Sequence, residues 1–225
     1  MYKFKIRASA VGKIWGSTTK LTQGNVTYLE NWLKEKLYDR RNEFNSKYCD
    51  KGNIMEEASV MLISEQLGQP LAKNEEYKEN DFLTGTCDID TGDTIIDIKN
   101  SWNCFTFPLF ADDVPNKDYF LQLQAYMELW GRDKAKLIYT LMDTPEHLIM
   151  QEAKGIAYKE GLDINEVYAQ IEKKHLYSDV ITPLRFKEFN IEKDEDVIAK
   201  IKQRVKMCQV YICLLYTSDA ADDLL

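Results

Sequence analysis

Hydrophobic and polar positions alternate with two different periods along this chain. The chain has no Pro/Gly-rich linker that would divide it into domains. Apolar residues spaced three and four apart predict helices, whereas apolar–polar alternation predicts strands. Helices are expected at residues 26–47, 54–67, 118–130, 146–175 with a break at Gly161, and 193–212. Strands are expected at residues 71–77, 82–89, 94–100 and 136–143. Strands and helices in this order indicate a single α/β domain.

Composition excludes several classes of protein. With 44% hydrophobic residues, the 225-residue chain can bury a core, which argues against disorder. No run approaches 18 consecutive apolar residues, and the basic start has no apolar run followed by a cleavage site, so neither a membrane span nor a secretory leader is expected. Five cysteines without a CxxC pair argue against a disulfide framework, a zinc ribbon or a cysteine-bound iron–sulfur cluster, and fit a reducing cytoplasm.

The net charge of −8 conceals an uneven distribution. Residues 1–51 contain 11 Lys and Arg against 5 Asp and Glu, and the first twenty residues have five basic groups and no acidic one. A positive N-terminal surface on an acidic body can bind a phosphate backbone, because binding responds to the local field rather than to net charge. For most of these charges taken singly, exposure on a solvated helix face is an equally good explanation.

The last residues resemble a reading frame through a transposase-derived sequencing adapter. From Cys213 the chain reads CLLYTSDAADD, a long match of low degeneracy. We therefore expect residues 213–225 to be a non-native addition and residues 1–212 to form one domain. A genuine disordered tail is the alternative.

The segment 85–102 carries the most informative polar pattern. On a strand over 94–100, Asp97 and Lys99 project from the same face. Asp88 ends the preceding strand, and a tight turn can bring it next to Asp97. Two converging carboxylates repel unless a cation or proton lies between them, and oxygen ligands without His or Cys suit Mg²⁺. An exposed salt bridge on an edge strand is the competing interpretation, since acid-x-Lys triplets occur three more times in the chain.

Glu56 is a second unusual acid. On a helical wheel it shares one face with Val60, Ile63 and Leu67, whereas Glu57 falls on the flank. This spacing predicts Glu56 in the middle of the apolar stripe, where an ionised carboxylate is costly unless it is paired or bound to a metal. Pairing with a core Lys or Arg is the simpler alternative.

The helix expected over 118–130 places polar groups on a mostly apolar surface. Gln122 and Tyr126 are four residues apart and lie on one face together with Tyr119. A buried amide and phenol need hydrogen-bond partners. They could orient a catalytic lysine or contact a phosphate, and hydrogen bonds to neighbouring backbone would satisfy them equally well.

Taken together, these residues resemble a family. Its motifs are matched, in order and spacing, by Arg7-Ala8-Ser9, Gly52 with Glu56, Gly85-Thr86-Cys87-Asp88, Asp97-Ile98-Lys99, and Gln122 with Tyr126. The chain resembles the PD-(D/E)XK nuclease superfamily and, within it, the phage lambda-exonuclease-like (YqaJ-type) recombination nucleases, over residues 5–212. One departure is Cys87, where the family usually has Pro. The resemblance implies a restriction-endonuclease-like core: a central mixed β-sheet flanked by helices.

The resemblance also implies an activity: Mg²⁺-dependent exonucleolytic hydrolysis of DNA at duplex ends, with Mn²⁺ as a substitute. Glu56, Asp88, Asp97 and the backbone carbonyl group of Ile98 are then the expected metal ligands. Lys99 is expected to position or deprotonate the attacking water, or to stabilise charge on the phosphate.

Further expectations concern the surroundings of the site. Gln122 and Tyr126 would brace it, and Arg7 and Ser9 would hold the DNA backbone or a terminal phosphate. A single-strand annealing protein as partner, a ring-shaped homo-oligomer and a phage-encoded enzyme in the cytoplasm of a bacterial host also follow from the resemblance.

Other functions stay open. A structure-specific endonuclease uses the same core, as does a RecB- or Cas4-like nuclease, although scattered cysteines give little support to the cluster that Cas4 proteins usually carry. A catalytically inactive DNA-binding protein of the same fold is the alternative from another class.

Overall fold

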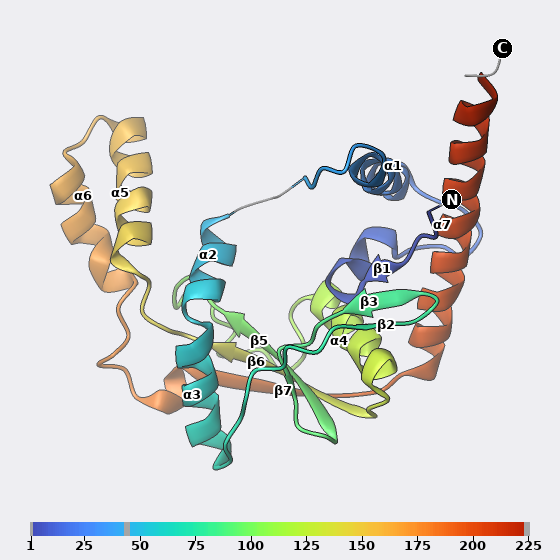
Figure 1. Ribbon diagram of the computed structural model, residues 1–225. Helices are drawn as coiled ribbons and strands as arrows, with labels where there is room; N and C mark the ends of the chain where they lie inside the picture. The colour runs from blue at the N-terminus through green and yellow to red at the C-terminus, as the bar shows by residue number, and fades with distance from the viewer. Residues whose placement is uncertain (1, 43–45, 223–225) are drawn as a thin grey trace.

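The computed structural model describes residues 2–42 and 46–222, with side chains of the last helix placed as far as Thr217. A four-stranded sheet in the order β4-β5-β6-β7 forms its centre, and a smaller sheet in the order β1-β3-β2 lies beside it (Figure 1). The strands are β1 (Ile6–Arg7), β2 (Lys78–Glu79), β3 (Leu83–Gly85), β4 (Ile89–Asp90), β5 (Thr94–Asn100), β6 (Lys134–Thr140) and β7 (Phe186–Glu192). The α-helices are α1 (Gln23–Leu37), α2 (Lys47–Ile54), α3 (Glu56–Leu67), α4 (Lys117–Trp130), α5 (Glu146–Glu160), α6 (Ile164–Ile171) and α7 (Glu195–Asp222), and the 3-10 helices are η1 (Ala8–Ile14), η2 (Glu172–Lys174) and η3 (Thr182–Leu184).

The central sheet is mixed. β5 and β6 run parallel, with Asp97 paired to Leu137, whereas β4 and β7 run antiparallel to their neighbours. α4 makes the crossover between the two parallel strands and packs on one face of the sheet, while α3 packs on the other. A parallel pair needs such a crossover because both strands must start at the same edge. The expected α/β core, a central mixed sheet flanked by helices, is confirmed.

Apolar clusters fill the two faces of this sheet. Ile95 of β5 joins the larger cluster, together with Leu123 of α4. Ile96 and Ile98 of the same strand join a smaller cluster with Ile63 of α3. The predicted alternation along β5 is therefore present, and its remaining odd-numbered side chains face α4.

The first long helix is shorter than expected. The helix predicted over 26–47 ends at Leu37, and α2 starts at Lys47; residues 43–45 lie outside the described residues. Asp39 has a φ of 49°, which belongs to the left-handed region and interrupts a right-handed helix.

The strands before the site also differ from the expectation. The range 82–89 contains two strands, because the chain leaves the small sheet after β3 and enters the central sheet at β4. The segment 71–77 is irregular: the Asn74 amide N–H donates to the Asp88 carbonyl oxygen (2.7 Å), and Asn74 Nδ2 donates to the Cys87 carbonyl oxygen (3.1 Å). β7 and η1 were not predicted, because β7 is rich in polar residues and η1 is a single short 3-10 segment.

The later helices agree with their predicted pattern. The break at Gly161 is present, with a φ of 69° that ends α5 in the left-handed conformation glycine favours. α5 and α6 form a hairpin that projects from the sheet (Figure 1) and has its own small apolar cluster. α7 continues beyond Ile212 to Asp222, and the non-native origin of residues 213–225 stays a prediction. Within the described part of the chain, none of the helices has the length and apolar character needed to cross a bilayer.

Arg204 ties the last helix to the beginning of the chain. Its side chain is fully buried, and its guanidinium donates to the backbone carbonyl groups of Ile14, Ser17 and Lys20 and to Asn25 Oδ1. A buried cation is costly unless acceptors replace its water, and these four oxygens do so. The loop between η1 and α1 is thus held by a residue far along the sequence.

We expect Arg204→Met to lower the free energy of unfolding by about 3 kcal/mol, because it leaves several buried acceptors without a donor. Urea unfolding followed by far-UV circular dichroism measures this change. Gln203→Met, at the exposed neighbouring position of α7, is the matched control and should change stability by less than about 0.5 kcal/mol. Equal losses in the two variants would contradict the role given to Arg204.

Candidate active site

A β-hairpin brings Asp88 opposite Asp97. Ile89 pairs with Ile96 across the antiparallel β4 and β5, so the residue before β4 faces Asp97 in the same register. Asp88 Oδ2 accepts a hydrogen bond from the backbone N–H of Ile98 at 2.7 Å, which fixes its carboxylate beside β5. The convergence expected from the turn between these strands is therefore present in the structure.

The Asp97 carboxylate is the most deeply buried charge of the hairpin, with a relative exposure of 0%. Its Oδ1 accepts a hydrogen bond from Gln122 Nε2 of α4 at 2.8 Å. Its Oδ2 forms an ion pair with Lys99 Nζ at 2.6 Å. This close ammonium compensates the charge of the buried carboxylate.

Lys99 is held between a carboxylate and an aromatic ring. Its Nζ contacts Asp97 and lies 4.8 Å from the ring centroid of Tyr119 on α4. Burial lowers the pKa of Lys99, but attraction to Asp97 and Asp88 outweighs burial, so that the net pKa is raised. In the absence of metal the lysine is therefore a cation that neutralises part of the acidic pair.

The polar face of α4 points at this pair. Gln122 donates to Asp97 rather than to neighbouring backbone, and its Nε2 lies 3.5 Å from the Tyr126 hydroxyl. Burial, followed by the charges of Asp97 and Asp88, raises the pKa of Tyr126, which keeps the phenol protonated. The ring of Tyr126 also explains Gly85, because a Cβ at that position would lie 2.9 Å from Tyr126 Cε1.

Glu56 differs from the sequence prediction. It lies in the first turn of α3 and is half-buried, at one end of the apolar stripe rather than in its middle. Its Oε2 forms an ion pair with Lys73 Nζ at 2.5 Å, and the Lys73 side chain is 53% exposed. The partner is therefore a surface lysine, not the core Lys or Arg of the simpler alternative. Glu57 is exposed, as predicted.

Lys73 also lies close to the acidic pair. A hydrogen bond to Glu56 raises the pKa of Lys73, and attraction to Asp88 adds to the rise. Asn74, the next residue, is hydrogen-bonded to the backbone of Asp88. No periodicity marks Lys73 in the sequence, so the pattern analysis missed it; its place depends on how the irregular segment 71–77 folds against β4.

A cluster of buried polar side chains connects α3 to the end of β5. Ser59 Oγ and Thr140 Oγ1 each donate to Asn100 Oδ1 at 2.9 Å, and the two hydroxyl groups lie 3.1 Å apart. Ser59 is one turn after Glu56, and Asn100 directly follows Lys99. The cluster therefore sets the position of the helix that carries Glu56 relative to β5.

The N-terminal residues lie in the small sheet, beside the strand that precedes Asp88 in the chain. β1 runs parallel to β3, with Arg7 paired to Thr84, so the start of the chain lies along the strand that leads to Asp88. Arg7 and Ser9 are both exposed. Burial raises the pKa of the Tyr28 phenol. The nearby Arg7 guanidinium partly opposes this rise, through its charge and a hydrogen bond.

The acidic pair has the chemistry of a cation site, although it is not a complete metal cage. Among residues 2–42 and 46–222, no three or more His, Cys, Asp or Glu side chains gather closely enough to hold a metal ion. Glu56 is therefore not brought together with Asp88 and Asp97 as the sequence predicted, and it pairs with Lys73 instead. The donors of the two facing acids are oxygens only, which suits a hard divalent ion, and in this respect Asp88 and Asp97 fit a divalent cation.

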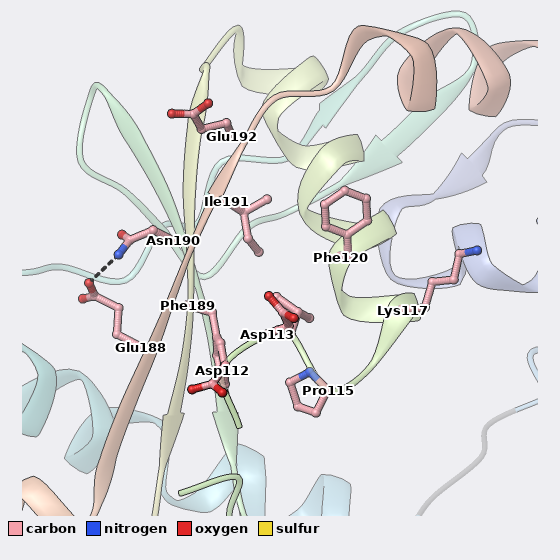
Figure 2. A pocket seen from close by; sticks show the side chains of 11 residues that line it. Asp112, Asp113, Pro115, Lys117, Phe120, Glu188, Phe189, Asn190, Ile191 and Glu192 are labelled. Atoms are coloured by element: carbon pink, nitrogen blue, oxygen red, sulfur yellow. Dashed lines mark hydrogen bonds between the residues drawn. The ribbon is translucent and has the colours of Figure 1, made fainter. Parts of the chain in front are cut away.

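A separate cavity of about 750 Å³ lies between β7 and the segment before α4, and contains none of these residues. Figure 2 shows carboxylates of Asp112, Asp113, Glu188 and Glu192 around it, with Asn190 hydrogen-bonded to Glu188. Such an acidic lining repels phosphate groups. This cavity is therefore not where a nucleic-acid backbone would bind.

The protonation of Asp88 gives a pH prediction for the metal-free protein. Burial, followed by repulsion from Asp97, raises the pKa of Asp88 to about 7. A carboxyl whose pKa is raised on folding stabilises the folded state below its unfolded pKa of about 4, and this contribution is lost as the pH rises through about 7. Asp88→Asn should therefore increase the free energy of unfolding at pH 8, by up to roughly 4 kcal/mol, and change it little near pH 4.

Urea unfolding in a chelating buffer at several pH values measures this difference. Asp93→Asn, at an exposed acid in the turn between the two strands, is the matched control and should not gain stability at pH 8. If the advantage of Asp88→Asn does not grow between pH 4 and pH 8, the carboxyl titrates normally and the two acids do not repel one another.

Comparison with solved structures gives the family. A phage-related exonuclease from Haemophilus somnus 129PT is 30% identical, with an alignment covering 96% of this chain and 97% of that one and a TM-score of 0.81. The alkaline exonuclease LHK-Exo from Laribacter hongkongensis has the same fold at 14% identity, with 98% and 95% of the two chains covered and a TM-score of 0.69. LHK-Exo in complex with dAMP gives 17% identity over the same shares and a TM-score of 0.68.

Comparisons with protein-family models and with curated protein sequences give no match. The identity of 30% over almost the whole of both chains is the decisive finding, because the lower identities to LHK-Exo show the fold alone. This chain belongs to the phage-related, lambda-exonuclease-like (YqaJ-type) family of the PD-(D/E)XK nucleases.

Proposed function

We propose that this protein is a Mg²⁺-dependent DNA exonuclease that hydrolyses phosphodiester bonds at duplex ends. The observation that carries the proposal is the buried Asp97 carboxylate, fixed between the Gln122 amide and the Lys99 ammonium with Asp88 opposite. Burying two facing acids is costly, and a structural salt bridge would need only one. The arrangement fits a site that binds a divalent ion and a phosphate.

The metal would be held by Asp88, Asp97, the Ile98 carbonyl group and Glu56, with Mn²⁺ able to replace Mg²⁺. When bound, such an ion lowers the pKa of water and neutralises charge on the phosphate. Glu56 would be a further ligand, and Lys73, which pairs with it in the metal-free protein, would compete with the metal for this carboxylate.

Lys99 would orient the attacking water or take its proton. Its ammonium is held by Asp97 on one side and by the Tyr119 ring on the other, which leaves the side chain few alternative positions. Gln122 donates to Asp97 from α4 and lies against the Tyr126 hydroxyl, and the two side chains would keep the Asp97 carboxylate pointed at the reacting centre.

DNA would reach the site along the basic N-terminal part of the chain. Arg7 and Ser9 are exposed; Arg7 pairs with Thr84 of β3, the strand that precedes Asp88 in the chain, and Ser9 follows in η1. A guanidinium and a hydroxyl group are suited to phosphate oxygens. A role in phage-type recombination, with a single-strand annealing protein as partner and a homo-oligomer as the working form, extends this proposal.

Nucleotide release from linear duplex DNA tests the activity. Wild-type protein should release nucleotides with Mg²⁺ and none with a chelator, while Asp97→Asn and Lys99→Met should each lower kcat by about 100-fold or more, since each removes a group that acts on the water or the phosphate. The matched controls are Glu172→Gln and Lys174→Gln. These two residues form another acid-x-Lys triplet, which lies in η2 outside the site.

Circular dichroism must show that the variants are folded. Full activity in Asp97→Asn and Lys99→Met, or no nucleotide release by the wild type, would overturn the proposal. Cutting of closed circular DNA would instead favour the endonuclease alternative, because a circle offers no end.

Competition between Lys73 and a metal ion for Glu56 gives a second test, which measures the affinity for the metal in the absence of DNA. Lys73→Gln should tighten Mg²⁺ or Mn²⁺ binding by about two- to fivefold, because it removes a partly exposed ion pair that competes with the metal. Glu56→Gln should weaken it. Isothermal titration calorimetry measures both, with Lys78→Gln as control, since Lys78 pairs with Glu76 outside the site. Unchanged affinity in Lys73→Gln and Glu56→Gln would show that Glu56 is not a ligand.

A further inference from the structure

β7 is the long edge strand of the central sheet. It pairs with β6 on one side, and among residues 2–42 and 46–222 it has no strand partner on the other. Its pairing with β6 is continuous over all 7 residues, without a bulge. An edge of this kind presents free backbone donors and acceptors to any extended chain that reaches it.

The register identifies the backbone groups that are free. Just beyond β7, the Lys193 N–H donates to the Asp133 carbonyl oxygen at 2.9 Å. Because hydrogen-bonded pairs alternate along an antiparallel ladder, the odd-numbered residues of β7 bond to β6. The N–H and C=O groups of Glu188 and Asn190 therefore point away from β6, towards the outside of the sheet.

The opposite edge of the sheet is covered, whereas most of the β7 edge is open. β4 has only 2 residues, and the Asn74 N–H donates to the carbonyl oxygen of Asp88, which precedes it. Among the described residues, coverage of β7 is limited to its C-terminal end, where the Glu192 carbonyl accepts from Gln124 Nε2. Short strands and covering segments usually protect an edge. The part of β7 up to Asn190 lacks this protection.

The cavity of about 750 Å³ runs along this free edge (Figure 2). The consecutive residues Glu188–Glu192 form one wall, with residues 112–115 and Phe120 opposite. Phe189 and Ile191 are almost fully buried and Phe120 is half-buried, so the floor of the cavity is apolar. Its volume lies in the range of about 300–1,000 Å³ that is typical of ligand sites.

The charge around the cavity is negative and largely uncompensated. Glu188 is paired with Lys136 of β6 at 3.0 Å. Lys117 is the only basic residue among the described residues that line the cavity, and its ammonium lies 5.3 Å from the centroid of the Trp15 indole, turned away from the acids (Figure 2). Three acids of the lining have no ion pair within the described part of the chain: Asp112, Asp113 and Glu192. Such a surface attracts cationic side chains.

We propose that the free edge of β7 and the acidic cavity beside it bind an extended basic segment of a partner protein, which adds a strand to the central sheet. In strand addition, backbone hydrogen bonds supply affinity, and pockets for alternate side chains supply specificity. Apolar side chains of the segment would pack on Phe120, Phe189 and Ile191. Its Lys or Arg side chains would meet Asp112 and Asp113.

This surface is separate from the candidate active site. Asp88 precedes β4, at the opposite edge of the central sheet from β7. A partner on β7 would therefore leave the acidic pair accessible. The inference goes beyond the proposed nuclease activity and does not depend on it, because peptide binding is measured without DNA.

Fluorescence anisotropy of labelled peptides tests the binding. The probe is a peptide as long as β7 (7 residues), in which lysine alternates with valine. It should bind the wild-type protein, and salt should weaken the binding. The same peptide with glutamate in place of lysine, or with methylated backbone nitrogens, should bind about tenfold more weakly or less, because it lacks the charge or the backbone donors.

Two variants assign the binding to the edge and to the acids. Asn190→Pro removes an N–H that points away from β6, so it should leave the ladder intact and weaken peptide binding by about tenfold or more. Asp112→Asn combined with Asp113→Asn should weaken it by about 2- to 30-fold, the range for two partly exposed ion pairs. The matched control, Glu160→Gln with Glu166→Gln, changes two exposed acids of the α5–α6 hairpin and should bind as the wild type.

Hydrogen exchange followed by NMR locates the added strand without any substitution. On peptide binding, the N–H groups of Glu188 and Asn190 should become protected, whereas those of Phe189 and Ile191, which already bond to β6, should change little. Unchanged exchange at Glu188 and Asn190 would overturn the proposal.

Other results would also overturn it. Absence of binding by the lysine–valine peptide would do so, and equal binding by its methylated form would show adsorption by charge alone. A smaller oligomer in Asn190→Pro, measured by sedimentation velocity, would show that the edge pairs with a second copy of this chain instead. Binding that requires lysine, free backbone N–H groups and an unblocked Asn190 supports the proposal.

Discussion

The whole arrangement depends on one buried charge, the carboxylate of Asp97. Its burial is tolerated because α4 supplies an amide on one side and β5 supplies an ammonium on the other. Moving α4 or reversing the register of β5 would leave the charge without compensation. The packing of the crossover helix on the sheet is therefore coupled to the chemistry of the site, and residues that fix this packing act on both.

One face of β5 carries core side chains, and the other carries the polar side chains of the candidate site. Ile96 and Ile98 fill the core against α3, while Asp97 and Lys99 face α4. The hydrogen bond from the Ile98 N–H to Asp88 joins these functions, because a residue whose side chain is in the core also fixes an acid in the site through its backbone. The polar cluster at Asn100 continues the link to α3 and Glu56.

Much of this was predictable from local periodicity. Alternation along a strand placed Asp97 and Lys99 together, a short turn brought Asp88 beside them, and four-residue spacing put Gln122 and Tyr126 on one helix face. The ion pair of Glu56 was not predictable, because Lys73 lies in an irregular segment whose path depends on tertiary hydrogen bonds.

The anchoring of the N-terminal segment by α7 has a consequence for biosynthesis. Arg204 and Gln209 hydrogen-bond to backbone between Phe4 and Lys20, about two hundred residues earlier. During translation, β1 can pair with β3 once both have left the ribosome, but the hydrogen bonds from Arg204 and Gln209 form only when α7 emerges. A nascent chain would thus contain all strands of the candidate site before the segment that carries Arg7 and Ser9 has its full set of contacts.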